Sequence, residues 1–335
     1  RDAVLTGLRD CVHDPSIYES FRDEEAMRTS LLRDTPRQNV EVTYRSILAG
    51  STVLTPFRFE FCLRGARAEE NEPPTLRVDV RPGSTPPSNV HVLIGRNGAG
   101  KTRLLLSLAE AILGQSADDT DPPGVLSFPD EAENQYGRFA SLVAVSFSAF
   151  DHFEPVRDPA RERLLKYSYV GLRRMMPDAT DQAETVTPHE DAQGAQLKSL
   201  DNLIADFSHS LAKCMSGPRL RRWRAAVETL SSDPGLADLN LAKLPDHPGD
   251  AARDDVVQVF RTLSAGHKIV LLTTTKLVEC VDARSLVLID EPETHLHPPL
   301  LGSFVRAVAD LLVQRNGVAV VATHSPVVLQ EVPLS

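Results

Sequence analysis

The stretch VHVLIGRNGAGKT, residues 90–102, decides the fold, because a short apolar run leads directly into the pattern GxxxxGKT. Its glycines allow the backbone to bend so that successive N–H groups face one anion. The run that follows, TRLLLSLAEAIL, predicts a helix that points the positive end of its dipole at the same anion. A strand, a glycine-rich loop and a helix in this order predict a phosphate-binding loop for a nucleotide. An ordinary glycine-rich turn is the alternative, and the flanking strand and helix argue against it.

Each position of this loop has an expected role. The backbone is predicted to surround the phosphates, Lys101 to place a positive charge near the outer phosphates, and Thr102 to offer its hydroxyl to Mg²⁺. The predicted nucleotide-binding residues are Gly95, Arg96, Asn97, Gly98, Ala99, Gly100, Lys101 and Thr102.

Length and composition limit the class of protein. A chain of 335 residues, 41% hydrophobic, suits one elaborated domain or two domains. No apolar run reaches the roughly 18 residues that a membrane span needs, and the first residues lack the apolar core of a signal peptide, so we expect a cytoplasmic protein without a membrane partner. The net charge of −10 excludes a uniformly basic surface and leaves room for a local basic groove. Because the chain does not begin with Met, we expect it to be part of a longer protein.

The four cysteines are scattered along the chain and show no CxxC spacing. Reduced thiols therefore explain them better than a metal cluster.

A second motif, LVLIDE at residues 286–291, combines a buried parallel strand with two acids at its end. Ligands of open α/β sheets bind at this carboxyl edge. Asp290 is predicted to hold Mg²⁺, directly or through water, and Glu291 to polarise an attacking water. Two solvated acids at a strand end are the alternative.

Two further motifs lie on either side of this strand. Residues 263–268, LSAGHK, place small residues at the start of a predicted helix, which is an anion site of the same kind or an ordinary serine cap. After a predicted helix from Pro298 to Gly317, the strand VAVVAT leads to His324, which either contacts a γ-phosphate or the attacking water, or has a structural role.

The ordered set GRNGAGKT, LSAGHK, LVLIDEP and ATHSP resembles the ABC-class ATPase heads, with their Walker A, signature, Walker B and switch-histidine motifs. Within that class, DEPETHLHP followed by THSP is similar to the OLD-type (overcoming lysogenization defect) and RecF/SMC-like ATPases rather than to transporter subunits. The resemblance covers roughly residues 50–150 and 259–335. It implies an α/β fold, an ABC-type P-loop ATPase head with a mixed central sheet, flanking helices, an antiparallel β flap and a mainly helical insertion.

The resemblance also implies a mechanism. Such heads bind ATP and Mg²⁺ in a head-to-tail homodimer or higher homo-oligomer, where Ser264 and Gly266 of one subunit close over the γ-phosphate held by the other. The implied catalytic residues are Lys101, Glu291 and His324, and the implied metal ligands are Thr102 and Asp290.

The chain departs from the family pattern at two places. Residues 293–297 align with the D-loop, which should cross the dimer interface, but His297 stands where transporters carry Asp. A metal site at His295 and His297 is the alternative for this segment. The Q-loop glutamine is not evident in LVAVSFSAFD, so Ser146, Ser148 or Asp151 would have to replace it.

The domain prediction follows from the motif positions. We expect an N-terminal helical extension (1–50), an ATPase lobe with Walker A (51–151), a mainly helical insertion (152–258), and a lobe with signature, Walker B and switch histidine (259–335). Strands are predicted at EVTYRS, FRFEFCLR and LRVDV. Helices are predicted in the insertion at RERLLKYSYVGLRRMM, AQLKSLDNLIADFSHSLAKCM and PRLRRWRAAVETL, and residues 231–255 are predicted to be loop-like.

Two predicted helices of the insertion carry basic clusters. Nucleic-acid phosphates are one candidate partner, with Trp223 available for stacking, and pairing with nearby acids is the other explanation. The clusters are Arg161, Arg163, Lys166, Arg173 and Arg174, and Arg219, Arg221, Arg222 and Arg224.

These motifs support one main hypothesis for function: an OLD-like ATPase that hydrolyses ATP, dimerises around it and regulates a nuclease or nucleic-acid-directed effector in antiviral defence. A RecF/SMC-type DNA repair ATPase and a slow-turnover, ATP-gated scaffold are the alternatives. No nuclease motif is visible in the sequence, so an acidic Toprim-type cluster would have to follow Ser335 or lie on another chain.

Overall fold

The structure is a computed structural model of the chain. It describes residues 2–32, 40, 44–48, 54–63, 74–113, 124–129, 139–148, 165–173, 197–239, 241 and 250–332. The chain divides into two compact units, Arg1–Leu54 and Thr55–Ser335. Among the described helices, none is both long and apolar enough to cross a membrane.

The N-terminal unit is built from short helices. Asp14 caps the second of them, because its side chain accepts a hydrogen bond from the Ser16 N–H at 2.9 Å, and Tyr18 on the same helix is fully buried. The strand predicted at EVTYRS is wrong in its second half, where a helix begins at Arg45; residues 41–43 lie outside the described residues. The elements are α1 (Asp2–Gly7), α2 (Pro15–Phe21), the π-helical turn η1 (Met27–Leu31) and α3 (Arg45–Leu48).

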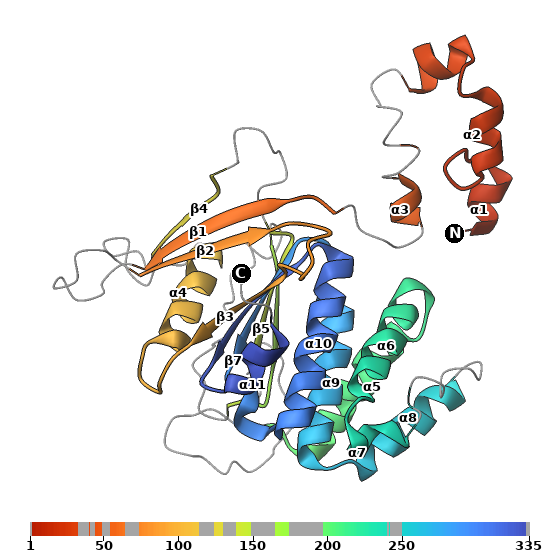
Figure 1. The fold of residues 1–335 in the computed structure, drawn as a ribbon. Coiled ribbons are helices and arrows are strands. Elements are labelled where there is room, and N and C mark those ends of the chain that lie inside the picture. The colour runs from red at the N-terminus through yellow and green to blue at the C-terminus, as the bar shows by residue number, and fades with distance from the viewer. Residues whose placement is uncertain are drawn as a thin grey trace, which may run out of the picture. The chain divides into compact units, whose positions relative to one another are not determined.

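A five-stranded parallel sheet forms the centre of the second unit (Figure 1). Its strands lie in the order β3-β8-β7-β5-β6. Strands β5, β7 and β8 are buried along their whole length, which explains why their sequences are nearly continuous apolar runs. The bounds are β3 (Val90–Ile94), β5 (Ser141–Ser146), β6 (Lys166–Gly171), β7 (Ser285–Asp290) and β8 (Val318–Thr323).

One face of this sheet is covered by a second, antiparallel sheet and by α4 (Lys101–Leu113). The antiparallel sheet has the order β2-β1-β4, with Phe59 opposite Val78. Leu286 and Leu288 of β7 point into this layer. Its strands are β1 (Phe57–Leu63), β2 (Thr75–Val80) and β4 (Gly124–Ser127).

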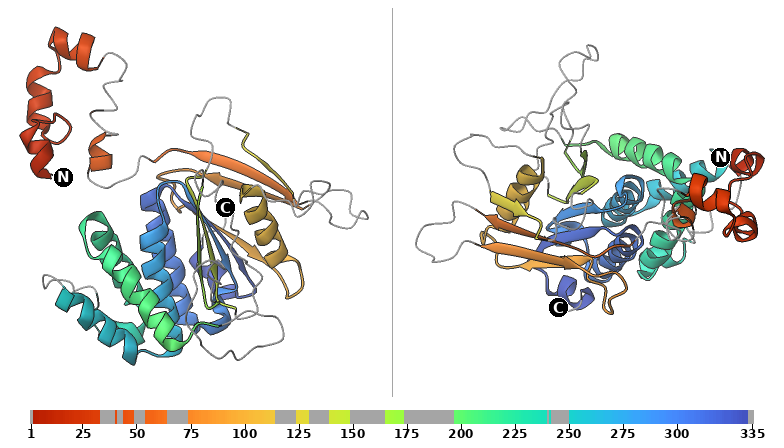
Figure 2. Two further views of the ribbon diagram at one scale, coloured as in Figure 1. Left: turned by 180° about the vertical axis from the view of Figure 1, so that it is seen from behind. Right: turned by 90° about the horizontal axis from the view of Figure 1, so that it is seen from above.

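The other face is covered by a layer of helices, into which the alternate β7 residues Val287 and Ile289 point. Figure 2 shows from two further directions that this layer and α4 lie on opposite sides of the central sheet. Its main helices are α5 (Leu200–Cys214), α6 (Gly217–Leu230), α8 (Asp250–Thr262), α9 (Ala265–Cys280) and α10 (Pro298–Arg315). Shorter helices are α7 (Pro234–Ala237), the 3₁₀ turn η4 (Pro292–His295) and α11 (Pro326–Glu331).

The predicted fold class is confirmed: the protein is α/β, with a central sheet, flanking helices and a separate antiparallel sheet. The described strands of the central sheet are all parallel rather than mixed. The strands predicted at FRFEFCLR and LRVDV are β1 and β2.

Two predictions within residues 152–258 are wrong. The helix predicted over residues 161–176 contains β6, which pairs with β5 at the edge of the central sheet. The prediction followed the Arg, Leu and Lys residues of this segment, which favour a helix. Aromatic and β-branched residues favour a strand instead, and here these are Tyr167, Tyr169 and Val170. The loop-like stretch 231–255 contains α7 and the start of α8.

The described part of the predicted insertion is thus integrated into the head. Strand β6 extends the central sheet, and residues of α5, α6 and α8 share one hydrophobic core with α9 and α10.

Candidate functional site

The order of the strands brings three of the sequence motifs together. Strand β3 lies beside β8, and β8 beside β7, so the segments that follow these strands meet at the carboxyl edge of the sheet. The Gly95 N–H donates to the Thr323 carbonyl at 3.4 Å, and the Glu291 N–H donates to the Ala322 carbonyl at 2.9 Å. These bonds hold the start of the phosphate loop, at Gly95, and the residue after β7, Glu291, against the end of β8.

The predicted phosphate loop bends at its glycines. Gly98 and Gly100 have φ angles of 81° and 88°, a region that residues with a side chain rarely adopt. Helix α4 begins at Lys101, whose Nζ donates to the carbonyls of Gly95 at 2.9 Å and Arg96 at 3.2 Å. The ammonium group therefore lies over the loop, next to exposed N–H groups at the helix start, which is a favourable place for a phosphate anion.

Thr102 and Asp290 meet although they are 188 residues apart, and the Thr102 hydroxyl donates to Asp290 Oδ2 at 2.8 Å. Asp290 is almost fully buried at the end of β7. Hydroxyl and carboxylate oxygens are the ligands that Mg²⁺ prefers, and neighbouring ligands of an octahedral Mg²⁺ lie about 3 Å apart. The donor set and its spacing therefore fit the predicted magnesium site.

Glu291 has a left-handed backbone, with φ 42° and ψ 58°. This conformation is unfavourable for a residue with a side chain, and such strain concentrates at functional sites. Strand β7 ends at Asp290 and η4 begins at Pro292, so Glu291 lies at the carboxyl edge without continuing the strand. Its position suits the predicted polarisation of a water beside the magnesium site.

His324 is held by an acid that sequence reasoning had placed elsewhere. Glu293 Oε1 accepts hydrogen bonds from the His324 N–H at 2.7 Å and the Thr323 hydroxyl at 2.7 Å, and it lies 2.9 Å from His324 Nδ1. Because Nδ1 faces a carboxylate, it carries a proton, and the ring is half-exposed. Glu293 belongs to the D-loop predicted from the sequence, residues 293–297. Its contact with His324 was not predicted; the only hint in the sequence is that Glu293 lies close to Glu291.

The signature residues occupy the start of α9. Ser264 caps this helix, and Gly266 comes so close to η4 that a Cβ there would lie 2.7 Å from the His295 carbonyl oxygen. Helix α9 packs on the face of the sheet opposite α4 (Figure 1). The structure thus brings Lys101, Thr102 and Asp290 together on the side of α4. The signature residues lie in the layer of helices on the opposite face of the central sheet.

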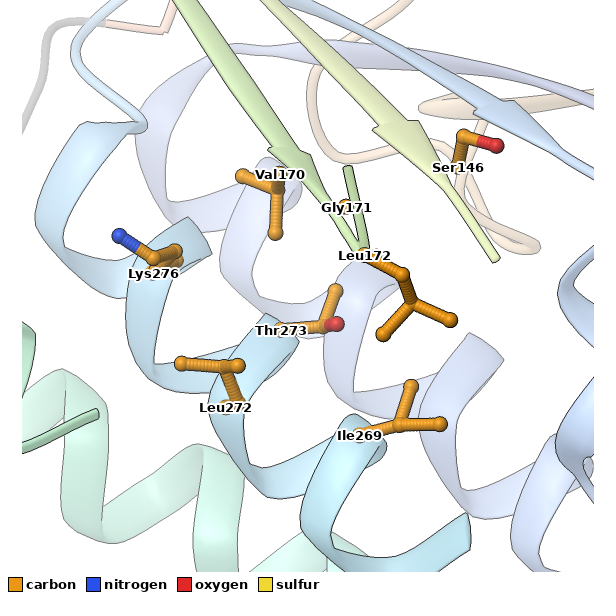
Figure 3. Close-up of a pocket in the computed structure, with 8 residues that line it drawn as sticks. All are labelled: Ser146, Val170, Gly171, Leu172, Ile269, Leu272, Thr273 and Lys276. Atoms are coloured by element: carbon orange, nitrogen blue, oxygen red, sulfur yellow. The ribbon is translucent and has the colours of Figure 1, made fainter. Parts of the chain in front are cut away.

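The candidates for the missing Q-loop glutamine lie at the end of β5. Ser146 pairs in register with Asp290 and is buried, and its hydroxyl accepts a hydrogen bond from the Ser148 N–H at 3.2 Å. Asp151 lies outside the described residues. Ser146 also borders a small pocket between α9 and the ends of β5 and β6 (Figure 3). The remaining lining residues are Val170, Gly171, Leu172, Ile269, Leu272, Thr273 and Lys276.

The prediction that Trp223 could stack on bases is wrong. Trp223 is fully buried, and its Nε1–H donates to Thr275 Oγ1 at 3.0 Å. Burial, with repulsion from Arg315, lowers the pKa of Arg222 to about 10. Of the four arginines of this cluster, only Arg221 is exposed.

In the other basic cluster, Lys166 pairs with Asp282 at 3.3 Å. Arg161, Arg163 and Arg174 of that cluster lie outside the described residues.

Comparisons with known proteins found a family model and a relative that match this chain. The family model described as "AAA domain, putative AbiEii toxin, Type IV TA system" matches residues 226–330, a range that contains Ser264, Asp290, Glu291 and His324. Protein ea59 of Escherichia phage lambda is 36% identical over 359 residues; the match covers 99% of this chain and 63% of the length of ea59.

A solved structure described as "An inward-facing conformation of a putative metal-chelate type ABC transporter" matches with 14% identity and a TM-score of 0.36, over 83% of this chain and 77% of that one. That likeness is too weak to bear on function. The family match over residues 226–330 and the site geometry both support a P-loop nucleotide-binding domain in this chain.

Proposed function

We propose that the protein is an ABC-type ATPase that binds ATP and Mg²⁺, dimerises around the nucleotide and hydrolyses it to ADP and phosphate. The observation that carries this proposal is the 2.8 Å hydrogen bond between Thr102 and Asp290, beside Glu291 and His324. It joins the end of β7 to the start of α4, so Asp290 lies beside the place where the outer phosphates of a nucleotide on the phosphate loop would bind, and Glu291 follows it directly in the chain.

In the proposed reaction, Lys101 and the loop N–H groups bind the phosphates. Thr102 and Asp290 would hold Mg²⁺, which would neutralise phosphate charge. Glu291 accepts a proton from a water whose oxygen attacks the γ-phosphorus. The bond from the γ-phosphorus to the bridging oxygen breaks, ADP leaves with that electron pair, and Glu291 later releases the proton to solvent. A His324 ring that carries a proton on both nitrogens, oriented through Nδ1 by Glu293, donates a hydrogen bond from Nε2 to the γ-phosphate.

A second subunit completes the proposed site. The signature at the start of α9 lies on the other side of the central sheet from α4, so a subunit does not close its own signature over its own phosphate loop. In a head-to-tail dimer, Ser264 and Gly266 of the partner instead meet the γ-phosphate, and residues 293–297 lie near the interface.

We further propose that ATP-driven closure regulates a nuclease or nucleic-acid-directed effector in antiviral defence, as in OLD-like ATPases. One finding supports an effector-linked role: the matching family model carries the description of a toxin of a type IV toxin–antitoxin system. The chain spans 63% of the length of ea59, so a further segment is available in that relative for an effector.

Substitution Glu291→Gln tests the ATPase proposal. The variant should bind ATP, hydrolyse it about 100-fold more slowly, the usual scale for losing a general base, and therefore accumulate as an ATP-bound dimer. Phosphate release and light scattering after size-exclusion chromatography measure the two effects. Glu110→Gln, an exposed acid on α4, is the matched control. Turnover equal to wild type would show that Glu291 is not the base.

A further inference from the structure

Three residues with no role in the proposed reaction come together beside the signature: Asp233, His267 and His297. Asp233 precedes α7, His267 lies in the first turn of α9, and His297 precedes α10. One ligand atom of each lies within 4.8 Å of the others. The carboxylate of Asp233 is fully buried, so it needs hydrogen-bond donors around it.

The hydrogen bonds determine where the ring protons are. The Leu300 N–H donates to His297 Nδ1 at 3.2 Å, so a neutral His297 carries its proton on Nε2, which lies 3.6 Å from Asp233 Oδ2. His267 Nε2 lies 2.9 Å from Asp233 Oδ1 and must also be protonated, because it faces a carboxylate. A neutral His267 therefore accepts at Nδ1.

The group that His267 Nδ1 contacts is the hydroxyl of Ser264, at 2.6 Å. The contacts thus run without a break from the buried carboxylate of Asp233, through the ring of His267, to the serine of the signature. Ser264 is exposed, so its oxygen is accessible to a second subunit.

The packing around His267 keeps its ring in this position. A Cβ at residue 235 would lie 2.6 Å from His267 Nε2 and Cε1, so the ring fills the space that the glycine leaves open. The Gly235 N–H donates to Asp233 Oδ1 at 2.9 Å, which fixes the carboxylate as well.

We propose that Asp233 and His267 are positioning residues for Ser264, and that they orient its hydroxyl toward the γ-phosphate held by the partner subunit. When the hydroxyl turns to donate to phosphate, it no longer donates to His267 Nδ1. A second proton, which His267 takes from solvent, then allows Nδ1 to donate to Ser264 Oγ, so the two residues stay bonded. Asp233 then balances the charge of the imidazolium ion. This inference rests on the proposed function, because it assigns a partner group to the same composite site.

Two histidines and a carboxylate could also hold a divalent metal ion. The bond from Leu300 argues against this, because it places the proton of His297 on the nitrogen that would have to coordinate the metal. The alternative that His295 and His297 bind a metal together is not favoured either, since His297 faces Asp233 and His267.

Complementation between subunits tests the proposal, because each site of a head-to-tail dimer combines one phosphate loop with the other subunit's signature. Asp233→Asn keeps the size of the side chain and removes its charge, and it should lower turnover about tenfold or more, the effect of losing a charge-assisted hydrogen bond. Mixed with Lys101→Ala, it should regain activity, because one site then has both an intact loop and an intact signature. Mixed with Ser264→Arg, it should gain no activity beyond its own residual turnover, because both signatures are defective.

His267→Gln should show the same pattern, and Asp310→Asn, an acid on α10, is the matched control with wild-type turnover. Recovery with Ser264→Arg, failure to recover with Lys101→Ala, or unchanged turnover of both variants would overturn the proposal. Calorimetric titration with zinc chloride tests the metal alternative. If the wild-type chain binds one zinc ion and His267→Gln binds none, the proposal is overturned in favour of a metal site. Failure of the proposed function is seen separately, as no recovery in a mixture of Lys101→Ala with Ser264→Arg.

Discussion

The phosphate loop and the signature are both anion sites at the start of a helix, yet they are held in different ways. The loop takes its shape from eight consecutive residues, with positive φ angles at Gly98 and Gly100. Long-range bonds hold its two ends, from Gly95 to Thr323 and from Thr102 to Asp290. The signature instead depends on contacts from Asp233 and from the His295 carbonyl, which come from other parts of the chain. A local motif can thus specify one half of a composite site, while tertiary packing positions the other half.

The largest effect is expected at the locally specified half. Lys101→Ala should weaken ATP binding by about 100-fold or more, because the variant cannot form charge-assisted bonds to two phosphates. Calorimetric titration with ATP and Mg²⁺ measures the affinity, and Arg103→Ala, an exposed residue of the same helix, should bind ATP normally. An affinity within about threefold of wild type, a difference below 1 kcal/mol, would contradict the phosphate-loop assignment.

A smaller effect is expected at the half that depends on packing. Gly266→Ala should lower the free energy of unfolding by about 1 to 3 kcal/mol, because the added methyl group would overlap the His295 carbonyl and force η4 to move. Urea denaturation measures this change, and Ala265→Ser, an exposed neighbour, is the control. Unchanged stability would mean that Gly266 is needed only for the phosphate and that the signature is not held from within its own subunit.

The same distinction explains which features the sequence could predict. Every residue proposed at the carboxyl edge follows a short apolar strand, so Lys101, Asp290, Glu291 and His324 were visible as contiguous motifs. Glu293 and Asp233 were missed as partners of histidines, because their importance comes from neighbours that are distant in the chain. Asp233 in particular lies in SSDPG, which looks like an ordinary turn.

The errors in the helical layer have a related cause. Strand β6 and buried Trp223 both lie among arginines, and local charge suggested exposed helices. Packing against α9 overrides that signal, since Trp223 bonds to Thr275 in the core between α6 and α9.

The smallest effect concerns nucleic acid. If phosphates bind α6, reversing the charges of Arg219 and Arg221 should make the plot of log affinity against log salt concentration less steep. The magnitude of its slope should fall by about 0.9 for each phosphate that the variant no longer binds, whatever the base sequence. Filter binding of DNA and RNA at several salt concentrations measures the slope, with Arg261→Glu on α8 as the control. An unchanged slope would assign these arginines to the structure of the layer itself.

The central claim is that a phosphate loop and a signature from different subunits form one site. Lys101→Ala and Ser264→Arg should each be inactive alone, the first because ATP is not bound and the second because the dimer does not close. The decisive measurement is ATP hydrolysis by a mixture of the two proteins, with heterodimer formation verified by two affinity tags. The account predicts that activity returns, because one of the two composite sites then has neither defect. Verified heterodimers that remain inactive would contradict it.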